Sequence, residues 1–136
     1  MHIDYILAFT QAPVYIECYM KIPKVIELQS DTNWVLKAKK NIYGQRQIGR
    51  VWNELLVGKI TSSSVRFRQS NIDECVLYQG KSIYILYTDY SILEGSDEEE
   101  LMQIVSDIKD YGLDITEKEY IEDFLGVNIY KVDSET

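Results

Sequence analysis

The alternation of apolar and polar positions predicts several short strands in the first third of the chain. Apolar runs at residues 3–9, 15–22 and 34–38 have the length of strands, and the polar residues 29–33 predict a loop before the third run. Pro13 and Pro23 follow the first two runs. Because proline has no backbone N–H to donate, both positions indicate that a strand has ended.

Two later stretches carry apolar residues at helical spacing. The first opens at Gly44, ends at the serines 62–64, and places its apolar stripe at Ile48, Val51, Trp52, Leu55, Leu56 and Ile60. In the second, Ser96 and Glu99 have the spacing of a capping box, and Gly112 is positioned to end the helix. Its apolar stripe comprises Leu101, Ile104, Val105, Ile108 and Tyr111.

The region between the two helices predicts a hairpin. A strand at residues 75–78 leads into a turn at Gly80, and a longer apolar strand at residues 82–93 carries Asp89 in its interior. A carboxylate inside a buried strand is costly unless its charge is compensated, as a bound metal cation would do. Residues 113–115 and 124–132 predict a last strand or a strand pair.

The resulting order of strand, helix, two strands, helix and strand is that of the ferredoxin-like fold, which belongs to the α+β class. In this fold both helices cover one face of an antiparallel sheet, and the other face is free for a partner or for chemistry. The first strand and the hairpin can be neighbours in such a sheet. We therefore expect Asp4 and Asp89 to approach each other there.

The charge of the chain is unevenly distributed. Its 136 residues are enough for one domain with a core, and the formal net charge of -8 argues against a surface that is basic throughout. Residues 35–53 hold five basic side chains and no acidic one, whereas residues 94–136 hold 14 acidic and three basic side chains. The basic segment is compatible with a phosphate-binding strip, and the acidic end with an ordinary solvated surface.

Targeting and cysteine signals point to the inside of a cell. No apolar run approaches the ~20 residues that span a bilayer. Met1 is followed at once by His2 and Asp4 rather than by a signal segment. We therefore predict an intracellular, cytoplasmic protein without membrane contact. Cys18 and Cys75 fit no metal-ligand spacing and are predicted to be free, buried thiols.

Two carboxylates that converge on an open sheet face suit divalent cations, which can clamp the attacking and leaving oxygens of a phosphoryl transfer. Mg²⁺ prefers carboxylate oxygens together with substrate phosphates, so few protein ligands are needed. Taken alone, the residues also allow simpler roles. Asp4 could be an acid at a strand edge, and Asp89 a buried carboxylate that is hydrogen-bonded to backbone.

Five short motifs occur in order around the tetrapeptide Tyr87-Thr88-Asp89-Tyr90. They are the first strand with its following turn at 3–13, the segment 19–24, the block 36–52, the strand 73–78 and the box 123–127. Together they resemble the reverse transcriptase of copia-type LTR retrotransposons, particularly a subgroup from diatoms and other algae. The tetrapeptide resembles the Tyr-x-Asp-Asp box of that family, with Tyr90 in place of its second aspartate.

The resemblance implies an RNA-directed DNA polymerase that uses Mg²⁺ or Mn²⁺, an RNA template, a DNA primer and deoxynucleotide triphosphates. By position, Asp4 and Asp89 would be the catalytic, metal-binding carboxylates. Phe9, Tyr43 and Gly44 would belong to the nucleotide pocket, where Phe9 would exclude a 2′-hydroxyl. Contacts to nucleic acid or to phosphates are implied for Lys39, Lys40, Arg46 and Arg50.

The resemblance also implies a partial reverse transcriptase domain over residues 1–136, with a first palm strand (1–14), a part of the fingers (15–44) and the palm (45–132). The remaining fingers, the thumb and the other domains of such an element are expected to lie outside it. Tyr90 departs from the motif, because a phenol does not bind Mg²⁺ as a carboxylate does. For both reasons we expect a catalytically impaired domain that is inactive as it stands.

A second interpretation is a small nucleic-acid-binding module without catalysis. RNA-recognition domains share the ferredoxin-like order and stack bases on aromatic side chains of the sheet. On one continuous strand, however, Tyr84 and Tyr90 would share a face and Tyr87 would lie on the other, so no common platform is expected. An unrelated α+β domain that dimerises through its hairpin is the interpretation that remains if the order of motifs is accidental.

Overall fold

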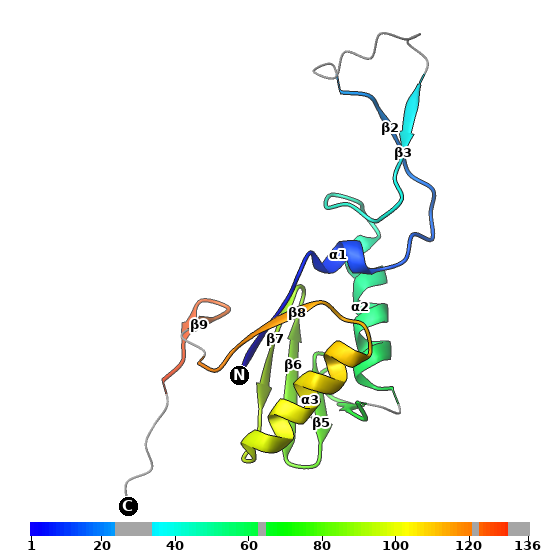
Figure 1. Ribbon diagram of the computed structural model, residues 1–136. Helices are drawn as coiled ribbons and strands as arrows, with labels where there is room; N and C mark the ends of the chain where they lie inside the picture. The colour runs from blue at the N-terminus through cyan, green and yellow to red at the C-terminus, as the bar shows by residue number, and fades with distance from the viewer. Residues whose placement is uncertain (24–33, 63–64, 121–122, 131–136) are drawn as a thin grey trace, which may run out of the picture.

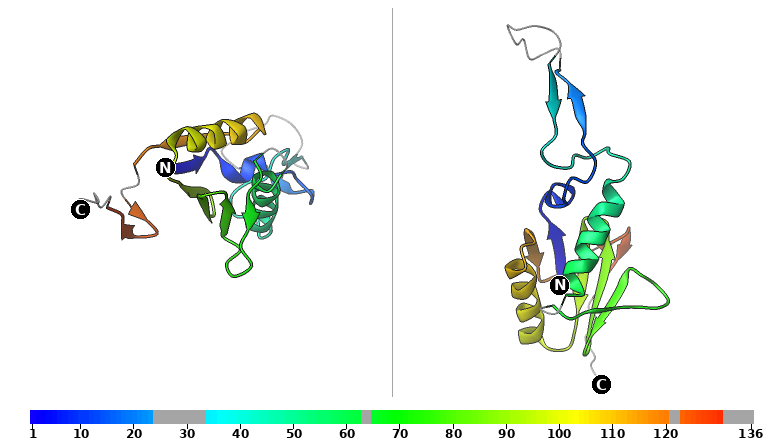
Figure 2. Two further views of the ribbon diagram at one scale, coloured as in Figure 1. Left: turned by 90° about the horizontal axis from the view of Figure 1, so that it is seen from below. Right: turned by 90° about the vertical axis from the view of Figure 1, so that its right-hand side faces the viewer.

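The structure is a computed structural model that describes residues 1–23, 34–62, 65–120 and 123–130. Its main body is an antiparallel sheet of six strands in the order β4-β5-β6-β7-β1-β8 (Figure 1). Two helices pack on one face of this sheet, α2 (Ile48–Ile60) and α3 (Glu98–Asp110) (Figure 2). The mixed α+β class is thereby confirmed. The strands are β1 (His2–Tyr5), β4 (Arg68–Gln69), β5 (Val76–Gln79), β6 (Ser82–Tyr87), β7 (Tyr90–Glu94) and β8 (Ile115–Lys118).

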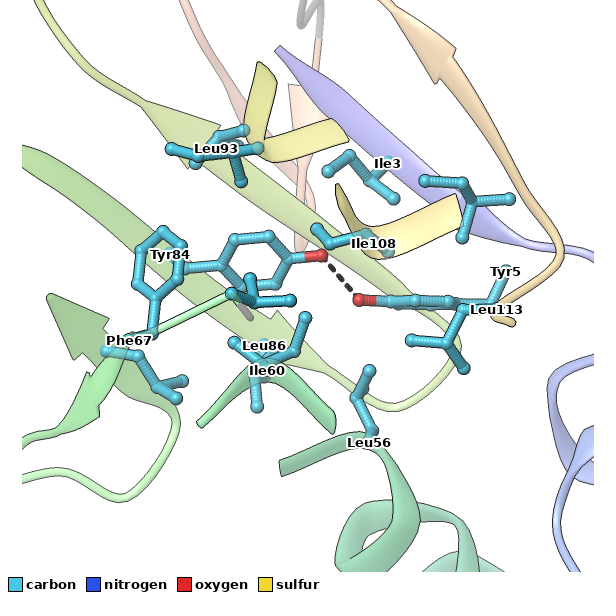
Figure 3. Close-up of a cluster of buried hydrophobic side chains, with 14 of the residues drawn as sticks. Ile3, Tyr5, Leu56, Ile60, Phe67, Tyr84, Leu86, Leu93, Ile108 and Leu113 are labelled. Atoms are coloured by element: carbon cyan, nitrogen blue, oxygen red, sulfur yellow. Dashed lines mark hydrogen bonds between the residues drawn. The ribbon is translucent and has the colours of Figure 1, made fainter. Parts of the chain in front are cut away.

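The core lies between the sheet and the two helices. Successive side chains of a strand point to opposite faces, and along β6 Tyr84 and Leu86 are buried while Ile83 and Ile85 are only half-buried. The helices supply the apolar stripes that their spacing predicts. Figure 3 shows side chains of both helices packed against those of the strands. The buried members of the stripes are Ile48, Val51, Trp52, Leu56 and Ile60 of α2 and Leu101, Ile104, Val105 and Ile108 of α3.

A small network of hydroxyl groups crosses this core. The Tyr5 and Tyr84 phenol oxygens are 2.5 Å apart (Figure 3), and the Ser91 hydroxyl donates to Tyr5 over 3.2 Å. Burial raises the pKa of Tyr5 to about 12 and that of Tyr84 well above its ordinary value. Both phenols are therefore neutral at physiological pH, and their mutual hydrogen bond satisfies groups that would otherwise be orphaned in an apolar environment.

The predicted continuous strand over residues 82–93 is wrong, because the chain reverses in its middle. β6 ends at Tyr87, Thr88 has a φ of 43°, and β7 begins at Tyr90, which pairs directly with Tyr87. Asp89 consequently lies in a turn and not in a buried strand. The turn was not predicted because the residues before and after it are mostly apolar, so that the two strands resemble one continuous apolar run. The hairpin around Gly80, which joins β5 to β6, is confirmed.

The first third of the chain contains shorter strands than the apolar runs predict. After β1, Leu7 adopts a φ of 49° and a single helical turn α1 (Ala8–Gln11) follows, so the strand predicted as far as residue 9 is wrong. β2 (Tyr19–Lys21) and β3 (Val35–Lys37) pair with each other and stand away from the main sheet (Figure 1). The loop predicted at residues 29–33 lies outside the described residues.

The helix ends differ from the predicted ones by a few residues. α2 begins at Ile48 rather than at Gly44, because Gly44 has a φ of +93°, which a right-handed helix does not accept. The cap of α3 is Asp97, whose carboxylate accepts from the amides of Glu99 and Glu100, so the predicted capping box at Ser96 is wrong. Gly112, with a φ of +81°, ends α3 as predicted.

The last described residues form a separate two-stranded hairpin, β9 (Asp123–Phe124) and β10 (Val127–Asn128), where a strand was predicted at residues 124–132. Residues 131–132 of that range lie outside the described residues, and the predicted segment 113–115 leads into β8, which pairs with β1. Cys18 and Cys75 are free, as predicted, but Cys18 is only half-buried and Cys75 is exposed. Among the described residues, the helices are all too short and too polar to cross a bilayer.

Candidate functional site

A row of four side chains crosses the face of the sheet that the helices leave uncovered. The register places Thr116 of β8, Asp4 of β1, Tyr90 of β7 and Tyr87 of β6 opposite one another in sequence. Residues that pair directly across antiparallel strands point to the same face. Asp4 is exposed while its neighbours on the same strand, Ile3 and Tyr5, are buried. The strand alternation thus puts the predicted carboxylate on the open face.

The turn that carries Asp89 lies beside β1 and is held from two directions. The Tyr5 amide donates to the Asp89 carbonyl over 3.0 Å, and the Trp52 indole N–H donates to the Thr88 carbonyl over 2.5 Å. Asp4 pairs with Tyr90, the residue next to Asp89. The structure therefore brings the backbones of the two predicted carboxylates together from 85 positions apart in the sequence.

Three aromatic rings gather around Tyr90. Its ring centroid lies 5.6 Å from His2, 5.2 Å from Tyr87 and 5.4 Å from Phe124, and Tyr87 lies 6.4 Å from Phe124. The expectation that Tyr84 and Tyr90 share a face is wrong, because the turn at Thr88 resets the alternation. Tyr84 is in the core, and Tyr87 joins Tyr90 on the open face. This cluster was not predicted from the sequence, although the polar pair at residues 88–89 was a signal for a turn.

The donor set around Asp4 does not fit a centre for two metal ions. The partial burial of its ring, and then its neighbours Tyr87, Asp89 and Asp123, raise the pKa of Tyr90 above its ordinary value. Tyr90 is therefore a neutral phenol at physiological pH and supplies no anionic oxygen. Across the described ranges, no group of three or more His, Cys, Asp or Glu side chains is arranged to hold a metal ion. Two carboxylates remain, Asp4 and Asp89.

The residues assigned to a nucleotide pocket also come together in space. Phe9 of α1 and Tyr43 have ring centroids 4.7 Å apart, and the space beside Gly44 is open where a Cβ would lie. Asn41, which the sequence analysis missed, ties the two segments together. It is buried, and its amide donates to the carbonyls of Ala12 and Pro13 over 2.9 and 2.7 Å. Its position between Lys40 and an apolar residue gave no signal for this role.

The basic side chains of residues 35–53 are exposed but partly neutralised. Lys39, Lys40 and Arg46 lie on the surface, and so does Arg50, which forms an ion pair with Glu54 one helical turn later (3.1 Å). Lys37, on β3, pairs with Glu17 from the segment before β2. Acidic residues from outside the segment therefore reduce the basic strip that composition alone predicts.

Fold and site together define an α+β domain with Asp4 exposed on the open face of an antiparallel sheet and Asp89 in the adjoining turn. The family model described as Reverse transcriptase (RNA-dependent DNA polymerase) matches residues 1–135. The chain therefore belongs to the reverse transcriptase family. No curated protein and no solved structure matches it.

Proposed function

We propose that this chain is a polymerase domain of a copia-type retrotransposon reverse transcriptase in which nucleotidyl transfer has been lost. The observation that carries the proposal is the direct pairing of Tyr90 with Asp4 on the open face. A neutral phenol occupies the position where the resemblance places a third carboxylate. The two-ion chemistry of the family needs that charge, because the cations stabilise the attacking and leaving oxygens together.

The proposed palm comprises β1, α2, β6, β7, α3 and β8. These elements follow one another as strand, helix, strand, strand, helix and strand, which is the ferredoxin-like order. Their strands are adjacent in the sheet, as β6-β7-β1-β8. We assign residues 1–14 to the first palm strand, residues 15–44, with the separate pair β2–β3, to the fingers, and residues 45–132 to the palm.

The proposed substrate contacts lie beside the carboxylates in this scheme. Phe9, Tyr43 and Gly44 would contact an incoming nucleotide, since the two rings pack together and Gly44 leaves open space. Template, primer or triphosphate groups would meet the exposed cations Lys39, Lys40, Arg46 and Arg50. Binding and orientation of a polyanion by these residues do not require a carboxylate at residue 90.

Calorimetric titration with Mn²⁺ and Mg²⁺ tests the proposed loss of the metal site. We expect no resolvable binding to the natural chain and a gain of roughly tenfold or more in affinity for Tyr90→Asp, because each added carboxylate strengthens a hard-cation site. Tyr90→Asn is the matched control, since it has nearly the same volume without the charge. Equal binding by the natural chain and Tyr90→Asp would refute the proposal, as would equal binding by the Asp and Asn variants.

The placement of Tyr87 and Tyr90 on one face favours a second candidate, a nucleic-acid-binding module without catalysis. Their rings are 5.2 Å apart on the side that faces away from the helices. Binding of single-stranded RNA that weakens with salt, is lost in Tyr87→Ala and does not respond to divalent cations would support this candidate.

A further inference from the structure

We infer that Tyr90 anchors the β9–β10 hairpin at the edge of the open face through its contact with Phe124, while Asp4 stays exposed beside it. The inference rests on the proposed loss of catalysis and goes further. It assigns Tyr90 a packing role in place of the lost charge. The same substitution would then remove a metal ligand and fix the hairpin beside the position where that ligand stood.

The ring contacts of Phe124 provide the attachment. Phe124 meets Tyr87 at an interplanar angle of 71° and Tyr90 at 80°, the edge-to-face arrangement that aromatic pairs prefer. Of the rings involved, Tyr90 touches the other three. Within the described part of the chain, no hydrogen bond joins β9 or β10 to the six-stranded sheet. The position of the hairpin therefore depends on these rings.

The turn of the hairpin supports this presentation of Phe124. Leu125 and Gly126 both have positive φ, 54° and 76°, and they connect the paired residues Phe124 and Val127. Two successive positive φ values are typical of the tight turns that match the twist of paired strands. Leu125 adopts this conformation, which is unfavourable for a residue with a side chain, and burial does not offset the cost because the side chain is exposed. The tight turn thus keeps β9 paired with β10, and β9 carries the Phe124 ring that contacts Tyr90.

Charge explains why the anchor is a tyrosine. Asp4 pairs with Tyr90, Asp89 precedes it, and Asp123 lies close enough to raise the pKa of its phenol. Tyr90 is therefore a neutral ring with one acidic residue across the strand pairing, one beside it in sequence and one on the hairpin. An aspartate at this position would add a fourth negative charge and repel Asp123, which would release the hairpin. The same three charges disfavour a polyanion on this face, so we assign the cluster to the hairpin rather than to a nucleic acid.

Backbone ¹⁵N relaxation of the full chain measures this docking directly. In the natural chain we expect order parameters of residues 123–130 near those of a rigid backbone, about 0.85. Tyr90→Phe should retain them, because it keeps the ring. Tyr90→Asn and Phe124→Ala should each lower them below about 0.6. Tyr90→Asp should do the same, with the amides of the core strands unchanged as the control for folding.

Two outcomes would overturn the inference. Order parameters that stay high in Tyr90→Asn and in Phe124→Ala would show that the rings do not hold the hairpin. Displacement of Phe124 by single-stranded RNA added to the natural chain would show that the cluster is a nucleic-acid platform. Failure of the proposed function is seen separately, as Mg²⁺ binding by the natural chain, and it leaves the relaxation result unaffected.

Discussion

The two faces of the six-stranded sheet are built from alternate residues of the same strands, but they carry different constraints. On the covered face, Ile3 and Leu93 are fully buried against the helices, and Tyr5 and Tyr84 satisfy each other's hydroxyl groups. On the open face, Asp4 is exposed and Tyr90 contacts other surface rings. The covered face preserves the fold, whereas a residue of the open face can change its chemistry without disturbing the core.

This difference is consistent with the loss of catalysis that we propose, because the family fold does not depend on residue 90. An exchange of a carboxylate for a phenol at residue 90 would touch no residue of the apolar core, since Tyr90 points away from the helices. A comparable exchange at Leu93, three positions later, would leave a charge or a cavity in the core. Conservation of the fold is therefore no guide to conservation of the site.

The strongest test of the comparison is a pair of neighbouring substitutions on β1. Ile3→Ala should lower the free energy of unfolding by about 2–5 kcal/mol, because it creates a cavity beneath both helices. Asp4→Ala, one residue later, should change it by no more than about 0.5 kcal/mol. Urea denaturation followed by far-UV circular dichroism measures both. Similar effects at the two positions would contradict the assignment of faces.

Alkaline pH should weaken the covered face. The pKa of Tyr5 is raised from 10.0 to about 12 in the folded state. Its contribution is therefore fully present below pH 10 and is lost as pH rises through 12, because the unfolded chain releases the proton first. We expect a loss of roughly 3 kcal/mol from Tyr5 over this interval. In Tyr5→Phe the slope of stability against pH should be shallower, whereas in Tyr120→Phe, which alters an exposed ring, it should not change.

Trp52 is buried on the covered face and also donates to the turn that carries Asp89. Its substitution should therefore affect the stability of the core and the order of the turn separately. Trp52→Phe keeps a ring in the core but removes the N–H that donates to the Thr88 carbonyl. We expect a loss of about 1–2 kcal/mol in stability, because the carbonyl loses its partner, and faster amide hydrogen exchange in the turn at residues 88–89. Unchanged exchange there, with normal exchange in α2, would mean that the turn is held by other contacts.

The smallest expected effect concerns the cap of α3, a helix of the covered face. Asp97→Ala should cost about 1 kcal/mol, because two amides of the first turn lose their acceptor. Ser96→Ala is the matched control and should be nearly neutral. Thermal denaturation of the two variants distinguishes them. A larger loss of stability in Ser96→Ala than in Asp97→Ala would mean that Ser96 caps the helix, as the predicted capping box requires.

The residues of the covered face were predictable because burial of one side of a helix requires apolar residues at regular spacing in the sequence. The apolar stripes of both helices were predicted except at Tyr111, which follows α3 and is exposed. The helix end at Gly112 followed from its conformational freedom. The reversal at Thr88 was not predictable from the period, since apolar residues flank it on both sides. In the structure, two hydrogen bonds from residues distant in sequence hold the reversal, one from the Trp52 indole and one from the Tyr5 amide.

The open face was predicted only in part for the same reason. The neighbourhood of Asp4 and Asp89 followed from the expected order of strands. The aromatic cluster did not, because it depends on the turn and on Phe124 from a hairpin that no other strand pairs with in the described residues. Exposed residues lack a periodic signal, so their grouping becomes visible only when the strands are in register.

We propose that Asp4 and the neighbouring Asp89 are retained at the open face but no longer support nucleotidyl transfer. Primer extension on an RNA template, with Mg²⁺ and with Mn²⁺, tests it most directly, with Asp89→Ala in parallel. We predict no extension by either protein. Extension by the natural chain that disappears in Asp89→Ala would contradict the claim, because it would show that a phenol at residue 90 is compatible with catalysis.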